Sequence, residues 1–107
     1  MSVLLEFAMF PTSGECRDGS SVSHQVAKII DMIDQSGLAY QLTPMGTIVE
    51  TASVKEALRV VERAYEQLEG CERIYSTIKL DIREGKLGRL EGKIASVEEK
   101  IGRRVKH

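Results

Sequence analysis

The stretch Gly37–Glu50, GLAYQLTPMGTIVE, restricts the fold of this chain more than any other part of the sequence. Pro44 holds its own φ at about −65°, which suits the second position of a turn that Thr43 can open by bonding to nearby backbone. Apolar and polar residues alternate before Pro44, and β-branched residues follow Gly46. The stretch therefore predicts a β-hairpin about a type I turn over residues 43–46.

A further strand is predicted on each side of this hairpin. Residues 2–10 are apolar on both alternating faces except at Glu6, as in a strand that is covered on both sides. Residues 72–83 alternate between an apolar and a polar face. We therefore expect a four-stranded sheet in which the last strand has one face in the core.

Two amphipathic helices are predicted between these strands. Ser20 or Ser21 can cap the first helix, which runs to about residue 36 and is ended by Gly37. The second begins in a capping box, Ser53-Val54-Lys55-Glu56, and Gly70 ends it. Its predicted apolar stripe consists of Val54, Ala57, Leu58, Val61, Ala64, Tyr65 and Leu68.

The element order strand-helix-strand, turn, strand-helix-strand predicts an α+β fold. Right-handed crossovers make it a ferredoxin-like split βαββαβ sandwich, with the first and third strands central and both helices on one face. A narrow apolar seam then predicts an additional C-terminal helix, which docks against its own sheet edge or a neighbouring subunit. At 107 residues we expect a single domain over 1–107. The seam consists of Leu90, Ile94, Val97 and Ile101.

The sheet face without helices is expected to form an interface. Leu4, Phe10 and Tyr75 would make an apolar patch there if water covered it. Association of identical chains is the simplest way to shield such a patch, so we expect a homodimer or homotetramer.

The overall composition excludes several classes of partner. The net charge is −1, so the chain lacks the excess of positive charge that attracts nucleic acid or an anionic membrane. No apolar run approaches the roughly 20 residues of a membrane span, and we expect a cytoplasmic protein. Cys16 and Cys71 do not form a disulfide framework or a metal motif, so we expect free thiols and neither a metal nor a cofactor.

The sequence contains no evident catalytic constellation. His24 lies among helix residues without a nucleophile or metal partner nearby in the sequence. Cys16 beside Arg17 could suggest a reactive thiolate, but the loop lacks the run of amides that phosphate chemistry uses. The first and third strands also lack the exposed aromatic residues on which RNA bases stack. We therefore expect no catalytic residues and no enzyme activity.

Glu6 allows two interpretations. Together with Phe10, Tyr75, Thr77 and Lys79 it could line a pocket on the open sheet face. The third strand would add either Thr47 and Val49 or Ile48 and Glu50 to that face. Alternatively, Glu6 and Lys79 simply pair across neighbouring strands inside an oligomer interface, and on the residues alone this is the simpler interpretation.

Several motifs resemble the MTH1187/YkoF-like family of thiamine-binding proteins, also called UPF0045. They are Pro11 at the end of the first strand, Ser21-Val22-Ser23, the hairpin stretch 37–50, IKLDIR at 78–83 and KIASVE at 93–98. The most specific is the Tyr-x-Leu-x-Pro-Met-Gly-Thr-x-x-Glu pattern that begins at Tyr40. The resemblance runs nearly end to end.

The resemblance implies a ferredoxin-like homotetramer built from dimers that, in some members, binds thiamine or its hydroxymethylpyrimidine half without catalysis. This chain departs from the family at Thr51, where a glycine often follows the glutamate, and in the longer loop 12–20. The family pattern marks most of the candidate ligand-binding residues, and Glu6 and Phe10 are added from the residue analysis. The full set is Glu6, Phe10, Pro11, Ser21, Tyr40, Thr43, Met45, Gly46, Thr47 and Glu50.

The expected function is therefore non-catalytic binding of thiamine or a similar pyrimidine by a homo-oligomer. A cationic thiazolium and a flat aminopyrimidine call for a carboxylate, an aromatic or thioether wall and a few directional hydrogen bonds. The alternative is an assembly module without a ligand, and a third interpretation is a small enzyme that uses Cys16 or Glu50. The sequence leaves open which ligand binds, what binding is for, and on which sheet face Glu50 lies.

Overall fold

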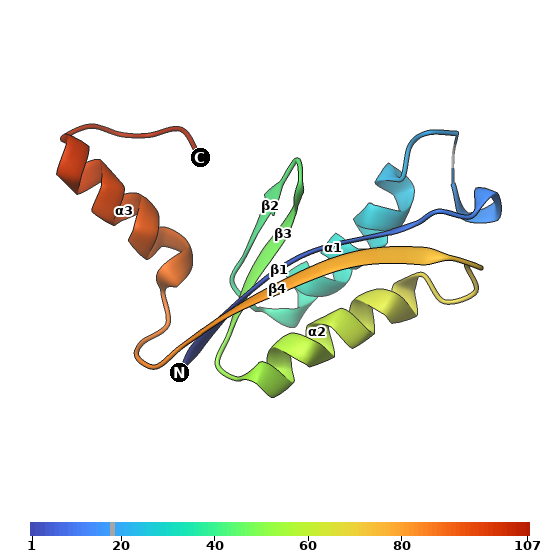
Figure 1. Cartoon of the computed structure of the whole chain (residues 1–107), viewed down its shortest axis with the longest axis horizontal. Coiled ribbons are helices and arrows are strands. Elements are labelled where there is room, and N and C mark those ends of the chain that lie inside the picture. The colour runs from blue at the N-terminus through green and yellow to red at the C-terminus, as the bar shows by residue number, and fades with distance from the viewer. Residues whose placement is uncertain (18) are drawn as a thin grey trace.

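The computed structural model describes residues 1–17 and 19–107, so position 18 of the predicted loop 12–20 lies outside the described residues. None of the helices in the described residues has the length and apolar character that crossing a bilayer requires. The element order confirms the predicted arrangement (Figure 1). The elements are β1 (Ser2–Pro11), a short 3-10 turn η1 (Gly14–Cys16), α1 (Ser23–Ser36), β2 (Tyr40–Thr43), β3 (Gly46–Thr51), α2 (Val54–Gln67), β4 (Ile74–Arg83) and α3 (Arg89–Ile101).

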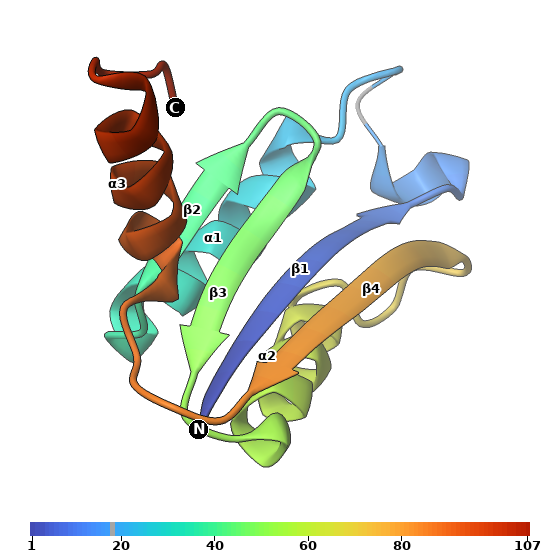
Figure 2. The same ribbon diagram turned by 60° about the vertical axis from the view of Figure 1, so that its left-hand side comes forward.

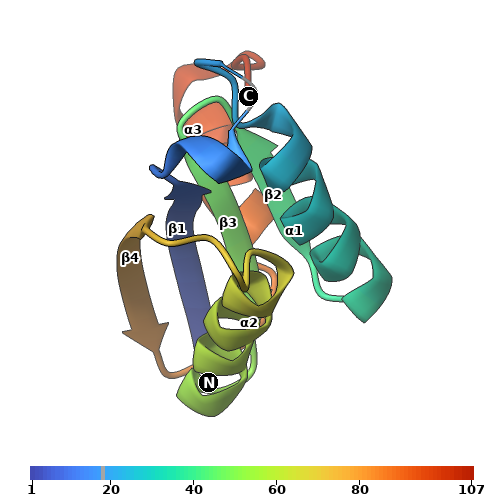
Figure 3. The same cartoon turned by 90° about the vertical axis from the view of Figure 1, so that its right-hand side faces the viewer.

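The four strands form one antiparallel sheet with the order β2-β3-β1-β4. The first and third strands are central, as predicted. Figure 3 shows α1 and α2 together on one side of the sheet and α3 on the other. This is the ferredoxin-like α+β sandwich with an additional C-terminal helix.

The core lies between β1, β3 and the two helices. Alternate residues of β1 point into it, and Val3, Leu5, Phe7 and Met9 are all buried. The intervening residues face the open side and are half-buried. The helices and β3 supply the remaining buried apolar side chains, which are Ile29, Met32, Ile33, Val49, Ala57, Val60, Ala64 and Leu68.

The predicted start of the second helix is confirmed, whereas that of the first is wrong. The Ser53 hydroxyl accepts a hydrogen bond from the Glu56 amide at 3.1 Å, and the Glu56 carboxylate accepts one from the Ala52 amide at 3.1 Å. The cap position of α1 is Val22, which makes no side-chain cap. Ser21 lies one residue too early and instead accepts a bond from the amide of the first helical residue.

Part of the predicted core is exposed on the β4 side of the sheet. Leu58 and Tyr65 were expected in the buried stripe of α2, and Ile78 and Ile82 on the core face of β4, but all four side chains are exposed. The reason is the width of the helix layer. The helices pack over β1 and β3, so β4 extends beyond their cover.

Helix α3 is fixed over the open sheet face by one buried carboxylate. Glu50, only 6% exposed, accepts hydrogen bonds from the amides of Gly88 and Arg89 at 3.0 and 3.2 Å and from the Ser2 hydroxyl at 2.6 Å. The Arg89 guanidinium also donates to the Ser2 carbonyl at 2.7 Å and pairs with Asp81 at 2.8 Å. β3 therefore presents Glu50, together with Ile48, on the open face.

The environment of Glu50 changes its titration. Burial alone would raise the pKa of this carboxyl, but the bonds from Ser2, Gly88 and Arg89 and the Arg89 charge outweigh burial and lower that pKa. Ionised Glu50 thus stabilises the fold above the pKa it has in the unfolded chain, about 4.3. The stabilisation is lost as the pH falls through the lower folded-state pKa.

We expect Glu50→Gln to lower the free energy of unfolding at neutral pH by roughly 1.5–3 kcal/mol, because it removes a charged acceptor of several hydrogen bonds. Urea unfolding measured over a pH series should show this difference shrinking as the pH falls below about 4.3. Glu62→Gln, on the exposed side of α2, is the control and should change little. A difference that stays constant down to acid pH would contradict this role of the charge.

The two cysteines form a disulfide, so the prediction of free thiols was wrong. Cys16 and Cys71 are 55 residues apart in sequence, but their Cα atoms lie 5.8 Å apart. Antiparallel pairing of β1 with β4 sets Pro11 opposite Ile74, which brings the loop after β1 beside the turn before β4. The periodicity of the sequence does not indicate that Cys16 and Cys71 lie close together.

Hydrogen bonds join the same two segments. The Thr12 amide donates to the Arg73 carbonyl at 2.9 Å, and the Arg73 amide donates to the Ser13 hydroxyl at 3.2 Å. The Glu15 carboxylate accepts from the Glu72 amide at 2.8 Å, which lowers the pKa of Glu15. The loop after β1 is therefore attached to the α2–β4 turn by several kinds of bond.

Reduction of the disulfide should lower the free energy of unfolding by about 2–4 kcal/mol, because the unfolded chain regains the freedom of a long loop. Urea unfolding with and without a thiol reductant measures this change. A variant with both Cys16→Ser and Cys71→Ser should unfold like the reduced protein and ignore the reductant. Identical curves for the oxidised and reduced protein would show that the cross-link does not stabilise the fold.

Candidate ligand-binding cavity

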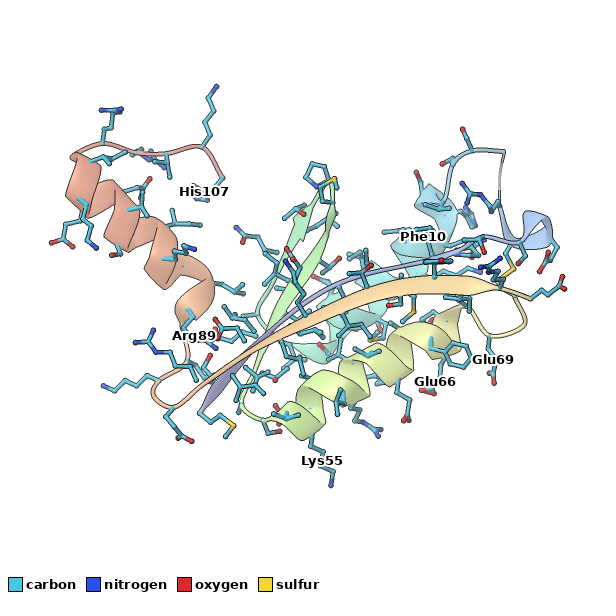
Figure 4. The ribbon with its side chains drawn as sticks, in the orientation of Figure 1. Phe10, Lys55, Glu66, Glu69, Arg89 and His107 are labelled. Carbon is cyan, nitrogen blue, oxygen red and sulfur yellow. A yellow bond between two sulfur atoms is a disulfide. The ribbon has the colours of Figure 1, made fainter. Side chains whose placement is uncertain are left out.

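A cavity of about 280 Å³ opens beside the tip of the β2–β3 hairpin. Its walls are residues 7–10 at the end of β1, Val22, Val26 and Ile29 at the start of α1, and residues 42–47 of the hairpin. The cavity thus lies where three elements from distant parts of the sequence meet. Figure 4 shows Phe10 at this end of the sheet and Arg89 at the other.

Thr43 and Gly46 shape the hairpin wall. The Thr43 hydroxyl accepts hydrogen bonds from the amides of Met45 and Gly46 at 3.2 and 3.1 Å and donates to the Gly46 carbonyl at 2.9 Å. A Cβ atom on Gly46 would lie 2.9 Å from the Phe7 carbonyl oxygen. Glycine therefore allows the hairpin to lie close against β1 and close one side of the cavity.

The cavity suits a flat and uncharged ring. Phe7, Phe10 and Met45 provide aromatic and thioether surface, while Thr43 and Thr47 provide hydroxyl groups. No carboxylate belongs to the described wall residues. A cationic group on the same ligand would therefore have to lie outside this cavity.

A groove between α1 and β2 adjoins the cavity and supplies carboxylates. The two share Val22, Val26 and Leu42. Asp31 and Asp34 line the groove with Tyr40, whose hydroxyl donates to Asp34 at 2.8 Å; this bond raises the pKa of Tyr40.

Sequence reasoning missed Asp31 and Asp34. They are one helical turn apart and lie off the apolar stripe of α1, which is the available sequence signal. Only the fold shows that Tyr40 of β2 lies beside Asp34.

Glu6 lies on the open face of the sheet, in a different hollow. It pairs with Lys79 at 2.8 Å, and the hydrogen bond raises the pKa of Lys79. Phe10 and Met45 border both this hollow and the cavity. The ion pair that was the simpler interpretation of Glu6 is present, on a surface that other chains can reach.

The structure brings many, but not all, of the predicted ligand-binding residues together. Tyr40 lies in the adjoining groove and Glu6 on the open face. Pro11 is buried just beyond the cavity, Ser21 is exposed before its α1 wall, and Glu50 lies at the opposite end of β3 beneath α3. The predicted residues in the cavity wall are Phe10, Thr43, Met45, Gly46 and Thr47.

The sequence profile of the thiamine-binding protein family matches residues 5–98. The chain belongs to this family. A UPF0045 protein of Methanothermobacter thermautotrophicus is 31% identical over 101 residues, which cover 92% of this chain and 99% of the relative. A UPF0045 protein of Mycobacterium bovis is 33% identical over 99 residues, covering 92% and 93% of the two chains. The matched residues include the end of β1, the hairpin and α1, which form the cavity.

Solved structures of similar chains confirm the fold. A hypothetical protein of Methanocaldococcus jannaschii superposes with a TM-score of 0.75 at 28% identity, covering 92% of this chain and 97% of that one. A Thermotoga maritima protein, described as a candidate for thiamine biosynthesis or salvage, has a TM-score of 0.73 at 21% identity. It covers 91% of this chain and 99% of its own. At that identity the likeness concerns the fold alone.

Replacing Gly46 with alanine should destabilise the protein by about 1–3 kcal/mol, because the new methyl group meets backbone that cannot move aside freely. Thermal and urea unfolding measure the loss. Met45→Ala is the matched control one position earlier. That side chain is 87% exposed, and its removal should change stability by less than about 0.5 kcal/mol. Equal effects of the two substitutions would mean that the close approach to β1 does not matter.

Proposed function

We propose that this protein binds thiamine, or its hydroxymethylpyrimidine half, in the cavity between α1, β1 and the hairpin, without catalysing a reaction. The observation that carries the proposal is the convergence of Thr43, Met45, Gly46 and Thr47 of the family pattern on the wall of one cavity, which Phe10 also lines. The same binding protein is proposed to act in the cytoplasm as a homo-oligomer.

The shape and chemistry of the cavity favour the pyrimidine end of the ligand. Its volume of about 280 Å³ lies just below the range of roughly 300–1,000 Å³ for sites that enclose a whole drug-sized molecule. Aromatic and thioether side chains can contact the flat ring, and the Thr47 hydroxyl can satisfy one of its amino or ring nitrogen atoms. The Thr43 hydroxyl is already used within the hairpin turn. The thiazolium would then extend out of the cavity.

Two carboxylates are candidates to hold that cation. Asp34 lies in the groove that adjoins the cavity, and its described hydrogen-bond partner, Tyr40, carries no charge. Glu6 borders the hollow on the other face, where Lys79 already neutralises it. A carboxylate without a neutralising partner attracts a cation more strongly than one that is already paired. We therefore propose that Asp34 holds the thiazolium and that Glu6 is the weaker candidate.

The placement of the residues proposed for catalysis supports a binding role. Cys16 lies in the loop after β1, beside Cys71 of the α2–β4 turn, and is not a wall residue of the cavity. The Glu50 carboxylate is engaged by Ser2, Gly88 and Arg89 at the opposite end of the strand from the cavity. Neither group is placed to attack a ligand held beside the hairpin tip.

The homo-oligomer in the proposal is supported by apolar surface away from the cavity. On α3, Val97 and Ile101 are 40% and 44% exposed, while Leu90 and Ile94 face a groove over the open sheet face. A marginal helix of this kind gains stability from a neighbouring chain. Four copies built from two dimers is the arrangement that the family resemblance implies.

Calorimetric titration of thiamine and of the neutral hydroxymethylpyrimidine tests the ligand and the carboxylate together. Asp34→Asn should weaken thiamine binding roughly tenfold to a hundredfold, the value of a charge-assisted contact, and affect the neutral fragment much less. Glu6→Gln should have a smaller effect on both ligands. Glu62→Gln on α2 is the control that leaves both affinities unchanged.

Each alternative gives a different result in this titration. A charge-dependent loss in Glu6→Gln instead would place the cation on the open face. Equal losses for thiamine and for the fragment would mean that the carboxylate positions the pyrimidine. No heat with either ligand, measured on protein freed of co-purified small molecules, would overturn the binding proposal and favour an assembly module without a ligand.

A further inference from the structure

The loop after β1 has two parts that are held in different ways. In the first part, Thr12, Ser13 and Glu15 form hydrogen bonds with the turn before β4. The second part begins at Cys16, which is joined to the same turn through its disulfide with Cys71. Figure 2 shows η1, which ends at Cys16, at the end of the sheet where β1 ends and β4 begins. Loss of the disulfide would therefore release mainly the second part.

Arg17, next to Cys16, connects two elements that border the cavity. Its guanidinium donates to the Pro11 carbonyl at 3.2 Å and to the Ser20 carbonyl at 3.0 Å. Pro11 is the last residue of β1 and directly follows Phe10, a wall residue of the cavity. Ser20 lies shortly before the start of α1. One side chain thus holds the end of β1 and the approach to α1 together.

The start of α1 is weakly fixed by its own residues. Val22 at the cap position makes no side-chain cap, and the first turn of the helix contains no acidic residue. A helix start of this kind gains little from capping or from the helix dipole. Val22 and Val26 nevertheless line the cavity. Because Cys16 directly precedes Arg17, its bond to Cys71 keeps the guanidinium in place and so orders this wall.

We propose that Cys16 and Cys71 form a thiol–disulfide switch that sets how tightly the cavity holds its ligand. This inference rests on the proposed function, since the ligand is that of the cavity. In the disulfide state the end of β1 and the start of α1 are already ordered. In the dithiol state the ligand has to order them, and the cost of ordering reduces affinity. The disulfide state therefore binds more tightly.

The surroundings of the cysteine pair suit a switch. Disulfides in reducing compartments are usually transient and redox-sensing. Cys16 and Cys71 are both half-buried and not fully enclosed, and exchange with a second thiol requires such access. The hydrogen bonds of the first part of the loop do not involve sulfur. The pair can therefore change state while the sheet and helices stay folded.

The exchange partner is a small cellular thiol. Its thiolate attacks one sulfur of the disulfide, forms a mixed disulfide and releases the other cysteine, which takes up a proton. A second molecule of the small thiol attacks the mixed disulfide, releases the remaining cysteine and forms the disulfide of the small thiol. The protein gains two electrons and two protons, and two molecules of small thiol are oxidised to one disulfide.

Calorimetric titration of thiamine into the oxidised and the reduced protein tests the switch. Reduction should weaken binding about tenfold, within the range of roughly 5–150-fold that is typical of coupling between sites. The variant with both Cys16→Ser and Cys71→Ser should bind like the reduced protein with or without reductant. Coupling is reciprocal, so saturating thiamine should lower the midpoint potential of the cysteine pair in glutathione buffers, by about 30 mV for a tenfold difference.

Arg17→Met tests how the switch reaches the cavity. It keeps an aliphatic side chain and removes both hydrogen bonds of the guanidinium. The oxidised variant should bind thiamine as weakly as the reduced unmodified protein, and thiamine should no longer shift its midpoint potential. Arg59→Met, at an exposed position of α2, is the matched control and should change neither value. Equal weakening in both redox states, with the potential shift retained, would overturn the role assigned to Arg17.

Hydrogen exchange without ligand separates this inference from the proposed function. Reduction should speed the exchange of the Gln25 and Val26 amides, which bond to the Val22 carbonyl, and leave the Gly92 amide of α3 unchanged. Equal thiamine affinities in the two redox states would overturn the switch and leave the proposed function standing. If thiamine does not bind at all, the proposed function fails and exchange decides. Unchanged exchange at Gln25 and Val26 would then overturn the switch too, whereas faster exchange on reduction would support it.

Discussion

The structure depends on the register of β1. This central strand pairs with β3 on one side and β4 on the other, and its side chains alternate between the helix layer and the open face. A slip of one residue would turn Glu6 into the core and expose Leu5, so both pairings are strongly specified. The same alternation places Phe7 in a cavity wall and Glu6 opposite Lys79. The arrangement of the candidate site and that of the open face therefore both depend on the register of β1.

Several carboxylates of this protein have structural tasks, and this limits which of them can serve a ligand. Glu50 organises the start of α3, and Glu6 balances Lys79. Asp34 is held by the neutral hydroxyl of Tyr40, so its negative charge is not cancelled by that bond. A carboxylate that lies in an apolar groove beside an aromatic side chain provides a suitable site for an organic cation. Physical chemistry thus separates three acidic residues that look alike in the sequence.

The disulfide of the loop after β1 would not be expected at the proposed cytoplasmic location. Disulfides persist in oxidising compartments and are rare where cellular thiols keep cysteines reduced. In a reducing cytoplasm Cys16 and Cys71 would be thiols, and the hydrogen bonds of Thr12, Ser13 and Glu15 would remain to hold the loop after β1 in place. The arrangement of this loop therefore does not rest on the sulfur bond alone.

The sequence by itself determined the elements, their order and the hairpin, because turn chemistry and the periods of strands and helices act over a few neighbouring residues. It also determined the hairpin side of the cavity, since Thr43 to Thr47 are contiguous. Only the tertiary structure decided which distant residues meet. The pairing of β1 with β4 brought Cys16 to Cys71, and the docking of α3 buried Glu50. The limited width of the helix layer left Ile78 exposed, because burial depends on what lies above a residue and not on its own pattern.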